Sequence, residues 1–302
     1  MPEAMLRTVT GPVPATAIDG PVLSREHLRT DMRWAVGIDS DPYRWLDEDQ
    51  TVTAELLELR QSDQLGLVVD LTCLGMGRDA AALARIAVDS RVPVIASTGL
   101  FAGPFAGSPD ADVETLTKRL MSEISDGLDG VGVFPGVIAQ VGCCGTEPTA
   151  AEERGLIAAA RAALASRLPV TTYGHNGLAM LEILLGEGLP GARVSVGYAD
   201  AEPAIARKIA ETGAYVSLGS LGSGPDQSAR IALDLIEDGH ADRLLLSTGV
   251  SRIAQVNRYG GPGYAHLFHT LLPRLRESGV GEDTIALVTR DNPLRWLTSG
   301  SA

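Results

Sequence analysis

The chain has 302 residues, of which 45% are hydrophobic, 21% charged and 4% aromatic. This size and composition are typical of a globular protein with a sizeable core, and they exclude disordered and collagen-like chains. The formal net charge of −13 disfavours binding to nucleic acid and to acidic membranes.

Short apolar runs typical of buried strands alternate along the chain with amphipathic stretches typical of helices. The predicted strands cover residues 21–23, 66–72, 92–98, 137–141, 170–173, 193–197, 214–218 and 243–248. The predicted helices cover residues 52–62, 80–89, 113–126, 150–166, 178–187, 202–212, 227–238 and 265–278. Eight strand–helix units over roughly 250 residues predict an α/β fold, a (β/α)8 TIM barrel, with a doubly wound open sheet as the alternative. Because no linker interrupts the pattern, we expect one domain over residues 1–302.

The sequence lacks the patterns of membrane and secreted proteins. No window approaches ~18 consecutive apolar residues, and the first residues lack the basic start and apolar core of a secretory signal. Three cysteines, Cys73, Cys143 and Cys144, do not form an even disulfide framework and lack a metal-binding spacing. We therefore expect a cytoplasmic protein with free thiols.

The stretch from Gly136 to Gly145 is the most informative for function. An apolar run from Val137 to Val141 contains Gln140 and is followed by Cys143 and Cys144. Central parallel strands deliver such side chains to the rim where α/β proteins keep their chemistry.

Several motifs together resemble the phosphotriesterase family of the amidohydrolase superfamily. The resemblance extends from about Thr10 to Leu297. The matching motifs, in family order and spacing, are residues 21–28, 76–79, 96–100, 136–140, 169–173, 193–198, 244–249 and 259–264. The resemblance implies the barrel fold and, for most members, hydrolysis with two divalent metals.

The family's metal ligands are a His-x-His pair after strand one, a bridging carboxylated Lys or Glu after strand four, a His after each of strands five and six, and an Asp after strand eight. Only the second of the paired histidines, His27, matches this pattern. The other positions hold Arg25, Gln140 (or Ala139 if the register slips by one), Tyr173, Tyr198 and Gly249. An amide, two phenols and a guanidinium do not replace the hydration of two cations, so we expect no metal and no other cofactor.

The replacement residues would converge at one barrel mouth and form a metal-free site. We predict catalytic roles for Arg25, His27, Gln140, Tyr173, His175 and Tyr198. Arg25 and the phenols would stabilise an oxyanion, while His27 or His175 would carry a proton. The alternative is decay, in which these positions drifted after metal binding was lost.

Further residues would contact the substrate. We predict this role for Cys143, Arg252, Tyr259 and Trp45, the last within an acidic, aromatic loop at 39–45 that suits a lid or a subunit contact. Cys143 or Cys144 as a nucleophile is the less favoured interpretation, because no recognisable Cys/His pattern accompanies them. Asp70, inside an apolar strand, is expected to pair with an arginine rather than to catalyse.

The sequence leaves three hypotheses for the function. The first is a metal-independent enzyme that hydrolyses a lactone, ester or amide, or performs a lyase or cyclase step in specialised metabolism. The second is a divalent-metal hydrolase with an unusual ligand set, and the third is a non-catalytic ligand-binding barrel. Under each, the partner is a small molecule, and the resemblance makes a homodimer a candidate assembly.

Overall fold

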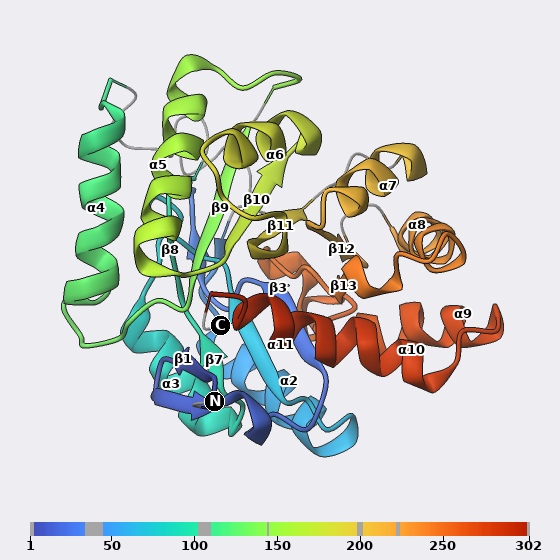
Figure 1. The fold of residues 1–302 in the computed structure, drawn as a ribbon. Coiled ribbons are helices and arrows are strands. Elements are labelled where there is room, and N and C mark those ends of the chain that lie inside the picture. Colours follow the sequence, from blue (N-terminus) through green and yellow to red (C-terminus); the bar gives the residue numbers. More distant parts are fainter. Residues whose placement is uncertain are drawn as a thin grey trace.

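The computed structural model describes residues 3–33, 45–101, 110–143, 145–197, 202–221 and 224–300. Its central feature is a ring of parallel strands surrounded by helices (Figure 1). In chain order the ring consists of β3 (Val22–Glu26), β6 (Leu67–Asp70), β7 (Val94–Ile95) with its continuation β8 (Ser97–Gly99), β9 (Val137–Cys143), β10 (Val170–Gly174), β11 (Val194–Gly197), β12 (Tyr215–Gly219) and β13 (Leu244–Ser247).

Helices follow the strands and cover the outside of the ring. They are α2 (Asp49–Ser62), α3 (Ala80–Ser90), α4 (Val113–Asp126), α5 (Ala150–Ser166), α6 (Gly177–Gly186), α7 (Pro203–Glu211) and α8 (Pro225–Glu237). After β13 the chain forms the π-helical turn η7 (Leu267–Leu271), α9 (Leu272–Glu277), α10 (Glu282–Ala286), a second π-helical turn η8 (Leu287–Asp291) and α11 (Asn292–Leu297). Short 3-10 helices are η1 (Ala15–Ala17), η3 (Gly191–Arg193), η4 (Ala241–Arg243), η5 (Ile253–Gln255) and η6 (Asn257–Tyr259).

The strand pairing closes the ring. Parallel ladders run from β8 through β9, β10, β11 and β12 to β13, and a second set joins β3, β6 and β7. Beside β13, Arg25 donates its backbone N–H to Ser247 Oγ at 3.1 Å, and just beyond the strand ends His27 donates its backbone N–H to Val250 O at 2.9 Å. The predicted (β/α)8 TIM barrel is therefore confirmed, and the open sheet is not the architecture.

Helix starts agree with local sequence chemistry. Thr149 caps α5, where its hydroxyl accepts from the N–H of Glu152 and the Glu152 carboxylate accepts from the N–H of Thr149. The carboxylates of Asp79 and Asp112 cap α3 and α4 by accepting from the N–H groups of Ala82 and Thr115, without the return bond from the helix. Such caps satisfy N–H groups that have no partner within the helix, which explains why these helices begin where the sequence predicts.

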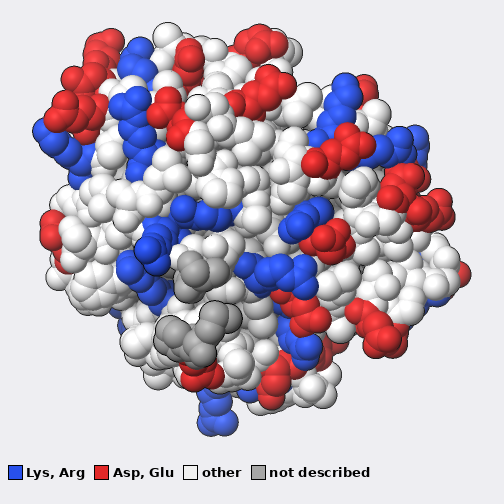
Figure 2. Space-filling view, in the orientation of Figure 1, with Lys and Arg blue, Asp and Glu red and all other residues white. Residues whose placement is uncertain are grey.

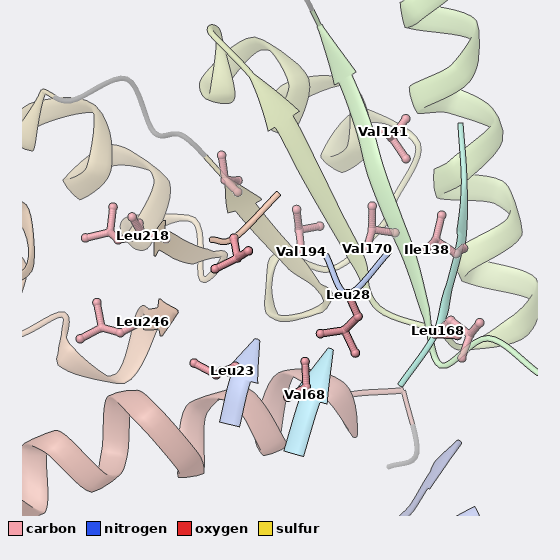
Figure 3. Close-up of a cluster of buried hydrophobic side chains, with 14 of the residues drawn as sticks. Leu23, Leu28, Val68, Ile138, Val141, Leu168, Val170, Val194, Leu218 and Leu246 are labelled. Carbon is pink, nitrogen blue, oxygen red and sulfur yellow. The ribbon is translucent and has the colours of Figure 1, made fainter. Parts of the chain in front are cut away.

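Alternating side chains of the strands form two apolar layers. Ile138, Val170 and Leu246 belong to the layer that packs against the helices, part of which is shown in Figure 3. Val22, Leu67 and neighbours on the other strand faces fill the barrel interior at its amino-terminal end. Parallel strands buried on both faces give the continuous apolar runs from which the sheet was predicted.

Two small antiparallel pairs were not predicted. β1 (Met5–Thr8) pairs with β2 (Gly11–Pro14), and β4 (Thr30–Asp31) pairs with β5 (Trp45–Leu46). Leu6 of the first pair packs with Trp296 of α11 across the amino-terminal end of the barrel. The two ends of the chain, marked N and C, lie close together in the view of Figure 1. Residues near both ends line one cavity on this side of the barrel.

Acidic and basic side chains both occur on the face shown in Figure 2, and several basic side chains gather near its centre. None of the helices in the described part of the chain is both long and apolar enough to cross a bilayer.

Candidate active site

Arg25 lies inside the barrel because β3 contains an irregularity. Leu23 pairs with Val68, whereas Glu26 pairs with Asp70, so β3 has one residue more than its partner over this interval. Such a bulge re-aims the side chains that follow it. The Arg25 side chain is buried and reaches β11 and β12: a methyl group built on Gly197 would lie 3.2 Å from its Nε, and one on Gly219 would lie 3.3 Å from its Nη1. Glycines at the ends of β11 and β12 therefore leave the space that this guanidinium fills.

Gln140 lies at a second bulge, on β9. Ile138 pairs with Val170 and Val141 with Thr172, so three steps on β9 match two on β10. Gln140 has a backbone φ of 47°, a left-handed conformation that is costly for a residue with a side chain. The bulge keeps Ile138 and Val141 both in the helix-facing layer and turns Gln140 toward His27, where its Nε2 lies 2.8 Å from the imidazole Nε2.

His27 is buried and hydrogen-bonded at both ring nitrogens. Its Nδ1 lies 2.9 Å from Thr72 Oγ1, and its backbone carbonyl accepts from the Tyr264 hydroxyl at 2.6 Å. Burial, and secondarily the charge of Arg25, lower the pKa of His27 to about 3. The imidazole is therefore neutral at pH 7. This environment does not suit the proton-carrier role expected from the sequence, because a general base works best with a pKa near the working pH.

Asp70 has different partners from those predicted. Its carboxylate accepts from the backbone N–H groups of Leu28 (2.6 Å) and Thr72 (2.9 Å) and from the Thr72 hydroxyl (3.3 Å). Burial raises its pKa to about 6, although these hydrogen bonds oppose the shift. The expected direct pairing with an arginine is wrong, because Arg78 acts on Asp70 only through its charge, and the hydrogen bonds come from N–H and O–H groups.

Glu26 is a residue that the sequence analysis missed. It is fully buried, and its carboxylate accepts from Ser247 Oγ and from the backbone N–H groups of Thr248, Gly249 and Val250 at 2.6–3.0 Å. It thereby joins β3 to the turn after β13. Burial raises its pKa to about 7, against the effect of these hydrogen bonds. Its position in the sequence indicates this role: Glu26 lies between Arg25 and His27, in a strand that is buried in a closed barrel, and a buried carboxylate needs hydrogen-bond partners.

Tyr173 lies at the carboxyl end of β10 against an apolar cluster. Its ring packs 5.6 Å from the ring of Phe101, centroid to centroid, and it adjoins Cys73 and Met76. A half-buried phenol on such a wall offers both a hydroxyl and an aromatic face.

Other predicted residues are distributed more widely. His175, two residues beyond Tyr173, is exposed. Cys143 is fully buried in the helix-facing core, where its thiol donates to Gly145 O at 3.1 Å, so the predicted substrate contact and the weaker nucleophile interpretation do not match its position. Tyr198, Cys144 and residues 39–44 of the proposed lid lie outside the described residues.

The remaining rim residues lie in surface segments. The Trp45 ring stacks under the Arg33 guanidinium at 4.9 Å, and the Tyr259 hydroxyl donates to Glu48 at 2.5 Å. Arg252 is exposed, and its backbone N–H donates to Gln255 Oε1. Their contact with a substrate stays a prediction.

The donor set does not fit the binuclear metal centre that the resemblance implies. A guanidinium has no lone pair to offer a cation, and its fixed charge repels one. The His27 Nε2 faces the Gln140 amide rather than an open position. Within the described ranges no three His, Cys, Asp or Glu side chains are grouped as a metal site.

Several known proteins are similar to this chain in sequence or in fold. The phosphotriesterase family model matches residues 4–297. N-acetyltaurine hydrolase of Rattus norvegicus is 27% identical over 343 residues, covering 97% of this chain and 97% of that protein. The solved phosphotriesterase homology protein of Escherichia coli, with phosphate in its active site, is 27% identical with a TM-score of 0.87, over 93% of this chain and 99% of that one. A lactonase from Listeria monocytogenes shares the fold with a TM-score of 0.90 at 22% identity, over 98% of this chain and 99% of that one.

Proposed function

Since the chain belongs to the phosphotriesterase family, we propose that it is a metal-independent enzyme whose barrel mouth acts on a small organic substrate by acid/base chemistry. The proposed reaction is hydrolysis of a lactone, ester or amide. The observation that carries the proposal is the buried Arg25 guanidinium at the ends of β11 and β12, beside a neutral His27 that is bonded to Gln140. Relatives named as a hydrolase and, by fold, a lactonase favour hydrolysis over a lyase or cyclase step.

Arg25 has the central role in this proposal. In acyl hydrolysis, water adds to the carbonyl carbon and the carbonyl oxygen becomes an oxyanion. A fixed guanidinium in a buried site stabilises that charge more strongly than water does, because it requires no reorganisation during the reaction. The same group would hold a carboxylate or carbonyl oxygen of the bound substrate.

The surrounding residues would bind the substrate and move the proton. Gln140 offers an amide with a defined orientation, and Tyr173 offers an aromatic face and a hydroxyl. Because His27 is neutral and occupied, we assign the proton transfer from water to the leaving group to His175, which is exposed just beyond the end of β10. Histidine is the side chain best suited to such transfers near neutral pH.

Turnover by metal-depleted protein tests this proposal. The purified protein is treated with a chelator, desalted, and incubated with lactones, carboxylic esters and N-acyl amides, with products identified by mass spectrometry. We expect hydrolysis of one class at the same rate with and without chelator treatment. Turnover that requires added zinc or manganese would establish the divalent-metal hydrolase, and binding without product would establish the ligand-binding barrel.

A further inference from the structure

A continuous chain of hydrogen bonds connects Gln140 to a buried carboxylate. Gln140 Nε2 lies 2.8 Å from His27 Nε2, His27 Nδ1 lies 2.9 Å from Thr72 Oγ1, and Thr72 Oγ1 lies 3.3 Å from Asp70 Oδ2. The four side chains are at most 5% exposed. They come from β9, from the end of β3 and from the end of β6, so the chain spans one side of the barrel mouth.

The chemistry of Asp70 sets the direction of this chain. An ionised carboxylate only accepts hydrogen bonds, and Asp70 already receives two backbone N–H groups. The Thr72 hydroxyl has one proton, which it donates to Asp70, so its oxygen accepts from His27. A neutral imidazole has one N–H, which this bond places at Nδ1. The Nε2 lone pair then accepts the Gln140 amide N–H.

We propose that Asp70 and Thr72 are positioning residues that hold His27 as the Nδ1–H tautomer and thereby orient the Gln140 amide within the mouth. The functional part of this inference rests on the proposed function, in which Gln140 contacts the substrate. The left-handed backbone at Gln140 agrees with it, since strained residues persist where their surroundings hold them in place. His27, the one residue that matches the family's ligand pattern, then serves to orient an amide.

The tautomer of His27 is directly measurable because the chain has only five histidines. Protein labelled with ¹⁵N only in histidine gives five imidazole signal sets, and His27→Gln identifies the one of interest. Above the Asp70 pKa of about 6, we expect Nδ1 protonated and Nε2 unprotonated in the wild type. The pattern should persist at every higher pH, because this imidazole does not ionise there.

Two substitutions at Thr72 separate positioning from packing. Thr72→Val keeps the shape of the side chain and removes its hydroxyl. The ¹⁵N chemical shifts of Nδ1 and Nε2 in His27 should then move toward each other, as in a mixture of the two tautomers. Thr72→Ser restores the hydroxyl and should restore the wild-type pattern. Thr117→Val, which removes a hydroxyl bonded within α4, is the matched control and should leave His27 unchanged. An Nε2–H tautomer in the wild type, or an unchanged His27 in Thr72→Val, would overturn the proposal.

The same spectra distinguish this inference from the proposed function. Addition of zinc should leave His27 unchanged if the site is metal-independent. Zinc bound at Nε2 would refute metal independence, while the tautomer of the zinc-free protein would still decide whether Asp70 and Thr72 position His27.

Discussion

The two ends of the barrel follow different rules. At the amino-terminal end the interior is filled by an apolar cluster to which Leu6 and Trp296 belong. At the carboxyl end two strands are bulged, Gln140 has a left-handed backbone, and Arg25, Glu26, His27 and Asp70 are buried. Burial of charged and polar side chains is costly, so the group formed by Arg25, Glu26, His27 and Asp70 favours the carboxyl end as the functional one.

Trp296→Ala should have the largest effect on stability. Trp296 is fully buried, and its truncation should lower the free energy of unfolding by about 3–5 kcal/mol through lost burial and a cavity. Turnover per folded molecule should not change.

Tyr173→Ala, at the half-buried mouth, should reduce turnover more than stability. Denaturant unfolding and turnover are measured on both variants. A larger loss of turnover in Trp296→Ala, or a larger loss of stability in Tyr173→Ala, would contradict the division between the two ends.

Arg25→Met should have the largest effect on turnover. Loss of a preorganised charge at a developing oxyanion typically lowers kcat by roughly 100-fold to 1,000-fold. Arg161→Met, on the outside of α5, removes an arginine paired with Glu187 and should leave the rate unchanged. Rates are compared on the substrate class identified with metal-depleted protein. Equal rates in Arg25→Met and the wild type would remove Arg25 from the site.

Glu26 should make stability depend on pH. The unfolded chain releases this proton near pH 4.5 and the folded protein near pH 7, so the folded state retains a proton in between. The contribution of Glu26 to the free energy of unfolding should therefore fall by about 3 kcal/mol as pH rises through this window, and be constant outside it.

Glu26→Gln does not titrate and is the control for that measurement. Denaturant unfolding at pH values below and above the window gives the change for each protein, so that the constant cost of the substitution cancels. Parallel pH profiles for Glu26→Gln and the wild type would show that Glu26 does not cause the dependence.

A smaller effect is expected from the backbone at Gln140. Gln140→Gly and Gln140→Ala both lose the bond to His27, but only glycine adopts a positive φ without strain. The glycine variant should be about 1 kcal/mol more stable than the alanine variant. Gln64 lies away from the mouth and has a φ of 58°, so Gln64→Gly and Gln64→Ala serve as the reference pair. Equal stability of the two Gln140 variants would mean that no strain is stored there.

The sequence predicted the regular end of the molecule better than the irregular one. Apolar runs and amphipathic stretches identified the strand–helix units, and helices 113–126 and 150–166 have the predicted bounds. The first strand was predicted to end at Leu23, whereas β3 extends through the polar residues Ser24, Arg25 and Glu26. It continues because the Glu26 carboxylate receives N–H groups from a turn more than 200 residues away.

The sequence predicted that Arg25, His27 and Gln140 lie together, but not how their side chains are hydrogen-bonded; their catalytic roles stay a prediction. The proximity followed from the barrel: Arg25, His27 and Gln140 converge at the mouth. The bulges at β3 and β9 are absent from any local pattern, since an extra residue in a ladder is defined only by the partner strand. Because the sequence does not reveal the bulges, it predicts neither the bond from Gln140 to His27 nor the hydrogen bonds through Thr72 to Asp70.

Metal content measures the central claim most directly. The purified protein is incubated with zinc or manganese, desalted, and analysed by inductively coupled plasma mass spectrometry, with His27→Ala beside it. We predict that neither protein retains metal, because Arg25 and the His27–Gln140 pair leave no donor set for a cation. Stoichiometric metal in the wild type that is lost in His27→Ala would contradict the account and identify a metal-dependent hydrolase with an unusual ligand set.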